Sequence, residues 1–350
     1  MKKFFIFFLI LFFPLKVNSL NASSITIMDM DNNRVLYSYN QNDKRLIASI
    51  SKIMTCIVTL NNSNINDNVI IDESVLKSYG SGIYVEIGEE ISLENLLYGL
   101  MLRSGNDAAI QIANYVGGSM DGFVKLMNDT ATLIGMKNTT FINSSGLETN
   151  NGIGNMSTSY DMALLMSYAM KNTTFKRIVS TKEKTVKTNF KTYVWYNKNK
   201  LLKNYKYCTG GKTGYTKKAK RTLVTTASKN NMNLVIVTLN DPNDFSDHLN
   251  LYEEYFRKYK NYKVLDKNEK FENSNYYLKN SKYITLLDEE YKKLNKEVVY
   301  YKKNVSDIVG YILIKLNDNI LLKEYIYEKN IKEEKNTNVF NKIKKILHIK

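Results

Sequence analysis

The chain has 350 residues, enough for a large domain and a smaller one, and 43% of them are hydrophobic, as in ordinary globular proteins. Its 50 Lys and Arg against 34 Asp and Glu give a formal net charge of +16. This charge favours anionic neighbours such as lipid headgroups or wall polymers, although AT-rich codon usage would produce the same excess of lysine. Nucleic acid is the poorest fit among these and is not expected as a partner, because the other features of the chain predict a place outside the cytoplasm.

Residues 1–22 have the pattern of a secretory signal peptide. Two lysines follow the first methionine, an apolar run covers 4–15, and the small residues Ser19 and Ala22 are two candidate cleavage positions. The apolar run is short for a transmembrane helix, so a retained anchor is the less favoured alternative. Either reading places the remainder of the chain outside the cytoplasm.

Residues 23–262 predict one α+β domain. Strand-like segments at 25–27 and 35–37 flank a turn and predict a hairpin, and strands return from 205 onward. A helical block between an early hairpin and a late meander predicts an antiparallel sheet with a helical subdomain. The helices are expected over 47–60, 92–102, 107–116, 123–134, 159–170 and 245–259, and the late strands over 222–227 and 234–239.

The composition changes after about residue 260. Short runs rich in Tyr, Val and Ile, separated by turn residues, predict a small all-β domain over 263–328. Residues 329–350 read as a linker followed by a helix with apolar residues on one face and lysines on the other. Such a helix is expected to lie on a membrane surface, the alternative being that it packs on the body of the protein.

Three short motifs follow one another in the chain: Ser49-Ile50-Ser51-Lys52, Ser104-Gly105-Asn106 and Lys212-Thr213-Gly214. Each is weak alone, because S-x-x-K occurs by chance in most chains of this length. In this order they are the signature of enzymes that open an amide or a lactam with a serine and a lysine, without a histidine.

The chemistry explains the first motif. A serine hydroxyl needs a base within hydrogen-bond reach, and residues three apart on a helix share a face, as Ser49 and Lys52 do. The lysine acts as a base only if burial or neighbouring cations lower its pKa, and Lys212 is the expected neighbour.

The other two motifs suit substrate binding. Ser104 and Asn106 lie on a turn between two predicted helices, where polar groups can face a cleft. Lys212 and Thr213, on a predicted edge strand, suit a terminal carboxylate, and Gly214 permits a close approach to the backbone. Binding a free carboxylate beside the scissile bond describes a carboxypeptidase.

With these motifs, the chain resembles low-molecular-mass penicillin-binding proteins, the serine-type D-alanyl-D-alanine carboxypeptidases of the bacterial wall. The resemblance implies the penicillin-recognising fold, a C-terminal membrane anchor and D stereochemistry. It gives Ser104 a proton-relay role and Asn106 a hydrogen bond to the substrate, and it makes the N–H groups of Ser49 and Tyr215 the oxyanion hole. The flanking segments that carry it are Ala48, Met54-Thr55, 96–103, Asp107-Ala108-Ala109, 133–136, Asn143, Gly146-Leu147 and 197–202.

The sequence departs from the family pattern at two positions. Ile47 stands where proline often precedes the serine motif, and Lys220 where glycine is common after the third motif, which could alter that turn. Arg221 is only a weak candidate for the additional carboxylate-binding arginine of some relatives.

These observations predict an exported serine D-alanyl-D-alanine carboxypeptidase at the outer face of the membrane. It would trim peptidoglycan stem pentapeptides through a Ser49 acyl-enzyme, and β-lactam antibiotics would inhibit it covalently. A D,D-endopeptidase that cuts cross-links remains an alternative, because only the accepted leaving group differs. A β-lactamase is less favoured because the middle motif is S-G-N, and the intact motifs argue against a non-catalytic wall-binding protein.

Neither a metal nor another cofactor is expected. The two histidines, His248 and His348, lack the spacing of metal ligands, and we expect both to face solvent. The two cysteines, Cys56 and Cys208, are expected to be buried free thiols, with a disulfide between them as the alternative.

Overall fold

The structure, a computed structural model, describes residues 21–305 and 307–329. The predicted membrane-surface helix lies outside the described residues, as does the predicted signal peptide apart from its last two positions. Within the described part of the chain, no helix is both long and apolar enough to cross a membrane.

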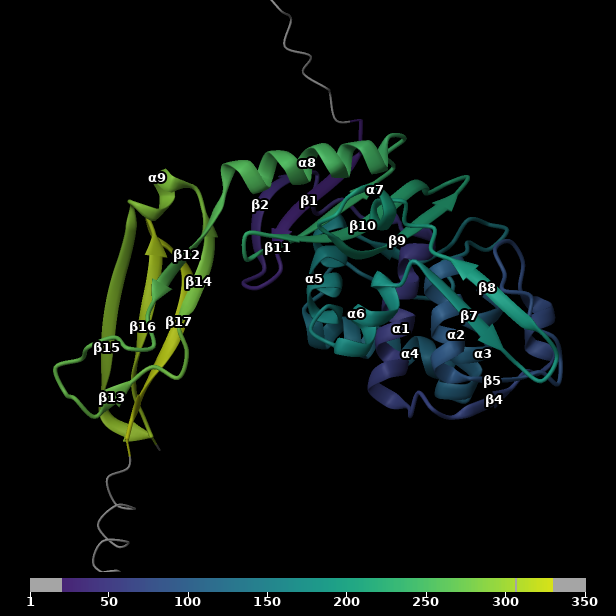
Figure 1. The fold of residues 1–350 in the computed structure, drawn as a ribbon, viewed down its shortest axis with the longest axis horizontal. Coiled ribbons are helices and arrows are strands. Elements are labelled where there is room, and N and C mark those ends of the chain that lie inside the picture. The colour runs from purple at the N-terminus through teal and green to yellow at the C-terminus, as the bar shows by residue number, and fades with distance from the viewer. Residues whose placement is uncertain (1–20, 306, 330–350) are drawn as a thin grey trace, which may run out of the picture.

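A five-stranded antiparallel sheet forms the centre of the larger domain, in the order β2-β1-β11-β10-β9 (Figure 1). The predicted early hairpin and late meander are both present, and β9 occupies the edge, as expected for the third motif. The strands are β1 (Ser24–Asp29), β2 (Arg34–Tyr39), β9 (Cys208–Thr216), β10 (Lys220–Lys229) and β11 (Met232–Leu239).

The two faces of this sheet pack on different helices (Figure 1). Successive side chains of a strand point to opposite faces, so Val235 joins the core under the helical block while Ile236 joins the core under α8 (Asp244–Lys258). The helical block consists of η1 (Ala48–Ser51), α1 (Lys52–Asn62), η2 (Glu73–Lys77), α2 (Leu93–Tyr98), η3 (Gly99–Arg103), α3 (Asn106–Gly117), α4 (Met120–Ile134), α5 (Ser159–Ala169) and α6 (Thr173–Ser180), with the short α7 (Leu201–Asn204) preceding β9.

Short strands connect the helices of the block. The pairs are β3 (Arg45–Leu46) with β6 (Met156–Ser157), β4 (Asn68–Ile70) with β5 (Glu90–Ser92), and β7 (Glu183–Lys187) with β8 (Thr192–Tyr196). The β7–β8 hairpin lies beside the helical block in Figure 1.

The last described segment is rich in strands and has an apolar core of its own, as the predicted small all-β domain requires. Its four-stranded sheet has the order β13-β17-β16-β15, and β12 pairs with β14. The elements are β12 (Lys260–Leu265), β13 (Tyr276–Tyr277), β14 (Lys282–Leu286), α9 (Asp288–Tyr291), β15 (Leu294–Val305), β16 (Ile308–Leu316) and β17 (Asn319–Glu328).

The prediction that His248 faces solvent is wrong. The side chain lies on the inner face of α8 and is fully buried against the sheet. Its Nδ1 is 2.7 Å from Oγ1 of Thr225 and its Nε2 is 3.0 Å from Oγ1 of Thr238. Because these hydroxyls satisfy both ring nitrogens, the ring is buried without unpaired polar atoms, and burial lowers its pKa to about 3. His348 lies outside the described residues.

Both cysteines are free, as the favoured prediction states, but the prediction that both are buried is wrong for Cys208. Cys56 is fully buried in α1, while Cys208 is partly exposed at the start of β9. Burial raises the pKa of both thiols, that of Cys208 to about 11, so neither is predominantly a thiolate at neutral pH.

Candidate active site

Ser49 lies in a 3-10 turn, η1, immediately before α1, which agrees with its predicted place at a helix start. The residue before it, Ala48, has a left-handed backbone with φ of 49°, a conformation that costs an L-residue free energy. Two contacts stabilise this turn. Ser51 Oγ donates to the Ala48 carbonyl at 2.8 Å, and Gly146 lies so close that a Cβ there would be 2.0 Å from the same oxygen.

Lys52 is fully buried one turn after Ser49. Its Nζ is 3.2 Å from Ser49 Oγ, and it donates to the carbonyl of Ser145 at 2.6 Å and to Oδ1 of Asn106 at 2.7 Å. The predicted pairing of serine and lysine is therefore present in the structure.

Burial and neighbouring positive charges lower the pKa values of two lysines near Ser49. Burial, followed by the charge of Lys198, lowers the pKa of Lys52 to about 7. Burial, followed by the charges of Lys52 and Lys198, holds the pKa of Lys212 well below its ordinary value. Lys212 therefore lies near Lys52, as expected. The cation that lowers the pKa of Lys52 is Lys198, however, a residue that the sequence analysis did not single out.

The second motif follows a π-helical turn, η3, that ends at Ser104 with φ of 65°. Ser104 is 4% exposed and lines the cleft described below. Asn106 begins α3 and is also buried, with its Nδ2 donating to the Tyr79 carbonyl at 2.5 Å. Both ends of the Asn106 amide thus have partners inside the protein, and one of them is Lys52.

The third motif lies on β9 beside the serine. Lys212 is buried, and its Nζ donates to the Thr213 carbonyl at 2.9 Å. A Cβ on Gly214 would lie 3.0 Å from the backbone nitrogen of Ser49 and 2.3 Å from Oγ1 of Thr222. Glycine is therefore required here because β9 passes close to the serine turn, a reason that comes from the fold and adds to the expected approach of a substrate.

A cleft of about 370 Å³ opens over Ser49. Its wall carries three cationic side chains, Lys198, Lys200 and Arg221, so the field in the cleft favours an anion. Lys198 Nζ also donates to Ser81 Oγ at 3.1 Å. The residues lining the cleft are Ser49, Ser81, Ser104, Lys198, Lys200, Thr213, Gly214, Tyr215, Arg221 and Phe245.

Arg221 reaches the cleft but is already paired. Its Nη2 lies 2.8 Å from Oδ1 of Asp244 and its Nε 3.1 Å from Oδ2, a bidentate ion pair. A larger cavity, of about 540 Å³, lies at the other end of β9 beside Cys208 and contains none of the predicted site residues. The chemistry therefore points to the smaller cleft.

Comparison with known proteins identifies the family. The model of the D-alanyl-D-alanine carboxypeptidase family matches residues 14–243. The chain belongs to this family. The family prediction made from the three motifs is therefore confirmed.

Individual proteins similar to this chain are named as D-alanyl-D-alanine peptidases. The chain is 35% identical over 222 residues to the D-alanyl-D-alanine carboxypeptidase DacF of Bacillus subtilis, a match covering 62% of this chain and 56% of that protein. It is 32% identical over 225 residues to a D-alanyl-D-alanine endopeptidase of Pseudomonas aeruginosa, covering 62% and 71%. The crystal structure of penicillin-binding protein 5 from Haemophilus influenzae shares the fold, with a TM-score of 0.75, 23% identity and coverage of 89% and 97%. The predicted fold class is thereby confirmed.

Proposed function

We propose that the protein is a serine D-alanyl-D-alanine carboxypeptidase that removes the terminal D-alanine of peptidoglycan stem pentapeptides through an acyl-enzyme on Ser49. The observation that carries this proposal is the surroundings of the Lys52 amine. Its two partners other than Ser49 are both hydrogen-bond acceptors, the Ser145 carbonyl and the Asn106 amide oxygen.

A neutral lysine amine has two N–H donors and one lone pair. The two acceptors take the two N–H groups, so the lone pair is left to face Ser49 Oγ at 3.2 Å. Since the pKa of Lys52 is lowered to about 7, a large fraction of the amine is neutral near neutral pH. Lys52 is therefore prepared to accept the proton of Ser49.

In the proposed reaction Ser49 Oγ attacks the carbonyl carbon of the penultimate D-alanine, and its proton passes to Lys52 Nζ. The backbone N–H groups of Ser49 and Tyr215 stabilise the oxyanion, each such donor being worth about 3–4 kcal/mol in the transition state. The close packing of Gly214 on the Ser49 backbone supports this placement, because it brings β9 beside one of the two donors.

The tetrahedral intermediate then breaks its C–N bond, and the leaving amine takes a proton relayed through Ser104, which lines the same cleft. Water subsequently attacks the Ser49 ester, and its proton returns the hydroxyl to the serine. Asn106 has both amide ends engaged within the protein, so its first role in this scheme is to hold Lys52. The family-derived hydrogen bond from Asn106 to the substrate stays a prediction.

The cationic wall of the cleft supports recognition of the C-terminal carboxylate. Lys198 and Lys200 supply charge, and Thr213 supplies a hydroxyl on the edge strand, whereas the buried Lys212 acts on the carboxylate through its field. Penicillins carry a carboxylate next to the reactive amide, so the same groups would orient a β-lactam for acylation of Ser49. The D stereochemistry and the peptidoglycan substrate come from the family.

A D,D-endopeptidase activity is the second candidate, because relatives with that name are among the proteins similar to this chain. It would use the same serine and lysine with a cross-linked peptide as the leaving group. We further propose that the protein works outside the cytoplasmic membrane, exported by its N-terminal segment and held at the membrane surface by its C-terminal helix, both of which are sequence-based predictions.

The proposal is tested by intact-protein mass after addition of benzylpenicillin. We expect one long-lived adduct of one penicillin per chain, absent from Ser49→Ala and present in Ser38→Ala, an exposed serine on β2 at the opposite edge of the sheet from β9. A short-lived adduct with drug turnover would indicate a β-lactamase, and no adduct in the natural protein would refute the catalytic proposal. Release of D-alanine from a pentapeptide, compared with cleavage of a cross-linked dimer, separates the two peptidase activities.

A further inference from the structure

The segment 78–89, here called the wall loop, forms one side of the cleft, where Ser81 lines it. Two of its carbonyls bind Asn106. Tyr79 O accepts from Asn106 Nδ2 at 2.5 Å, and Ser81 O accepts from the Asn106 backbone N–H at 2.7 Å. The wall loop is therefore in direct contact with the residue that holds Lys52.

The first contact fixes which end of the Asn106 amide faces Lys52. While Nδ2 donates to the Tyr79 carbonyl, Oδ1 is the end directed at Lys52 Nζ, and an amine N–H meets an acceptor. If the Tyr79 carbonyl moved away, Asn106 could present its NH₂ group instead, and two donors would face each other. The position of the wall loop thus decides the orientation of the base.

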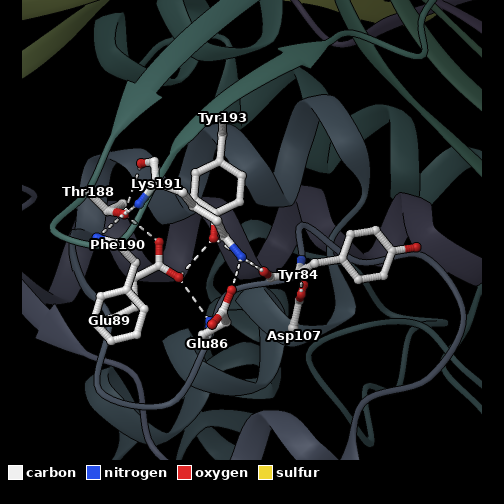
Figure 2. A network of polar contacts seen from close by, with 8 residues as sticks. All are labelled: Tyr84, Glu86, Glu89, Asp107, Thr188, Phe190, Lys191 and Tyr193. Atoms are coloured by element: carbon white, nitrogen blue, oxygen red, sulfur yellow. Dashed lines mark hydrogen bonds and ion pairs between the residues drawn. The ribbon is translucent and has the colours of Figure 1, made fainter.

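The far end of the wall loop is anchored by a buried carboxylate (Figure 2). Glu89 is fully buried. Its Oε2 accepts from Tyr193 Oη at 2.8 Å and from the Glu86 N–H at 2.9 Å, and its Oε1 accepts from Thr188 Oγ1 at 2.6 Å. Two of these donors belong to the β7–β8 hairpin, which therefore acts as the support of the loop.

The middle of the wall loop is held from two sides. The Tyr84 carbonyl accepts from Tyr193 Oη at 3.2 Å and from Lys191 Nζ at 3.1 Å, and Lys191 also pairs with Glu86. From the other side, Asp107 accepts from the Tyr84 N–H at 2.6 Å. Figure 2 shows these contacts meeting around Tyr84 and Glu89.

Tyr193 joins the two anchor points through the one proton of its hydroxyl, which is shared between the Glu89 carboxylate at 2.8 Å and, as the weaker arm, the Tyr84 carbonyl at 3.2 Å. Burial, together with the charge of Glu89, raises its pKa, so the hydroxyl keeps its proton and remains a donor. The ring is 9% exposed and packs on Trp195, which prevents the hydroxyl from swinging away.

We propose that Tyr193, on a hairpin that does not line the cleft, is a positioning residue for acylation of Ser49: through Glu89 and Tyr84 it fixes the wall loop, which fixes Asn106 and thereby Lys52. The inference rests on the proposed function. Tyr193 touches neither the serine nor the substrate cleft, so its effect passes entirely through this series of hydrogen bonds.

The experiment measures the rate of acylation by a fluorescent penicillin from pH 5 to 10 in the natural protein, Tyr193→Phe and Tyr196→Phe. The Phe replacement removes the hydroxyl and keeps the ring. Tyr196 is a matched control because it lies on the same strand, is 49% exposed and has its ring beside Lys203. Lys191→Ala is a second variant on the exposed side of the network, in case Tyr193→Phe folds poorly.

We expect acylation by Tyr193→Phe to fall at least tenfold at pH 7, with Tyr196→Phe unchanged, since small misplacements of catalytic groups have effects of this size. We also expect the acidic limb of the profile to move to higher pH. A loosened wall loop admits water, and weaker burial raises the pKa of Lys52, which is otherwise held down by burial and Lys198 against the opposing charge of Asp107.

A natural rate in folded Tyr193→Phe would overturn the inference, and if that variant does not fold, a natural rate in Lys191→Ala would do so. A reduced rate with an unmoved acidic limb would also overturn it, because the surroundings of Lys52 would then be intact. Failure of the proposed function itself looks different: the natural protein would not be acylated at all.

Discussion

The amide oxygen of Asn106 lies 2.7 Å from the amine nitrogen of Lys52, deep enough that both side chains are buried. This acceptor is neutral. It can hold an N–H of the uncharged amine without stabilising the ammonium ion as a carboxylate would. The choice of asparagine over aspartate therefore keeps the base usable near neutral pH.

Replacing Asn106 by Asp should suppress acylation at neutral pH. A carboxylate at this distance raises a lysine pKa by about 1–3 units, and the amine is neutral only above its pKa, so the active range moves to higher pH. Starting from about 7, such a rise reduces acylation at pH 7 by roughly 5- to 500-fold and restores it above pH 8 to 10. The penicillin acylation rate against pH measures this, and an unmoved profile would contradict it.

Lys52→Met should be inactive yet more stable at pH 7. The pKa of Lys52 is about 7 when folded against 10.5 ordinarily. The unfolded chain therefore binds an extra proton between these values, and the natural protein loses stability as pH falls through that window, by roughly 5 kcal/mol in all. Two acceptors left without a donor offset part of this, each by about 1–3 kcal/mol. We expect a net gain of about 1 kcal/mol at pH 7.

Denaturant unfolding at several pH values tests whether Lys52→Met has a higher free energy of unfolding than the natural protein. The advantage over the natural protein should shrink as pH rises towards 10.5, because the lysine becomes neutral in both states. A constant difference across this range would mean that protonation is not its cause.

The burial of His248 predicts sensitivity to acid. Its pKa is about 3 when folded and 6.5 ordinarily, so the unfolded chain binds one more proton between these values. Stability then falls with pH by up to about 1.4 kcal/mol per pH unit below 6.5. His248→Gln, which stays uncharged, should show a flatter dependence between pH 6.5 and 4 in urea titrations. Parallel curves for the two proteins would argue against this assignment.

The turn after the third motif predicts a stabilising substitution. Lys220 has φ of 59°, a left-handed conformation that glycine adopts without steric cost. We expect Lys220→Gly to raise the free energy of unfolding by about 1 kcal/mol. Lys217→Gly is the matched control in the same turn: with no left-handed backbone to relieve, it should be neutral or destabilising. Thermal melts distinguish the two, and equal effects would refute the argument.

Much of the site could be predicted because its chemistry is local. Ser49 and Lys52 share a helix face at a fixed spacing, so their contact follows from the sequence, and the hairpin and meander follow from strands separated by evident turns. The residues that were missed depend on long-range packing. Lys198 reaches the cleft from the segment after β8, far along the chain from both Ser49 and Ser81.

His248 was considered in the sequence but given the wrong environment, because it is buried and not exposed to solvent. The absence of metal-ligand spacing led to the expectation that it faces solvent, whereas Thr225 and Thr238 on two strands supply partners for both its ring nitrogens. Lys220 was recognised as a departure from glycine, but its left-handed φ became visible only in the structure. In each of these positions a tertiary partner or a backbone dihedral decides the outcome, and neither is encoded in periodicity.

The contact between Gly146 and the Ala48 carbonyl has a consequence for the order of assembly. The serine turn takes its conformation against a glycine about a hundred positions later in the chain, and such distant contacts form late in folding. A partly folded molecule would thus hold a serine that lacks its oriented base. Under the proposed mechanism, covalent labelling by penicillin therefore counts only those molecules whose catalytic domain has finished folding.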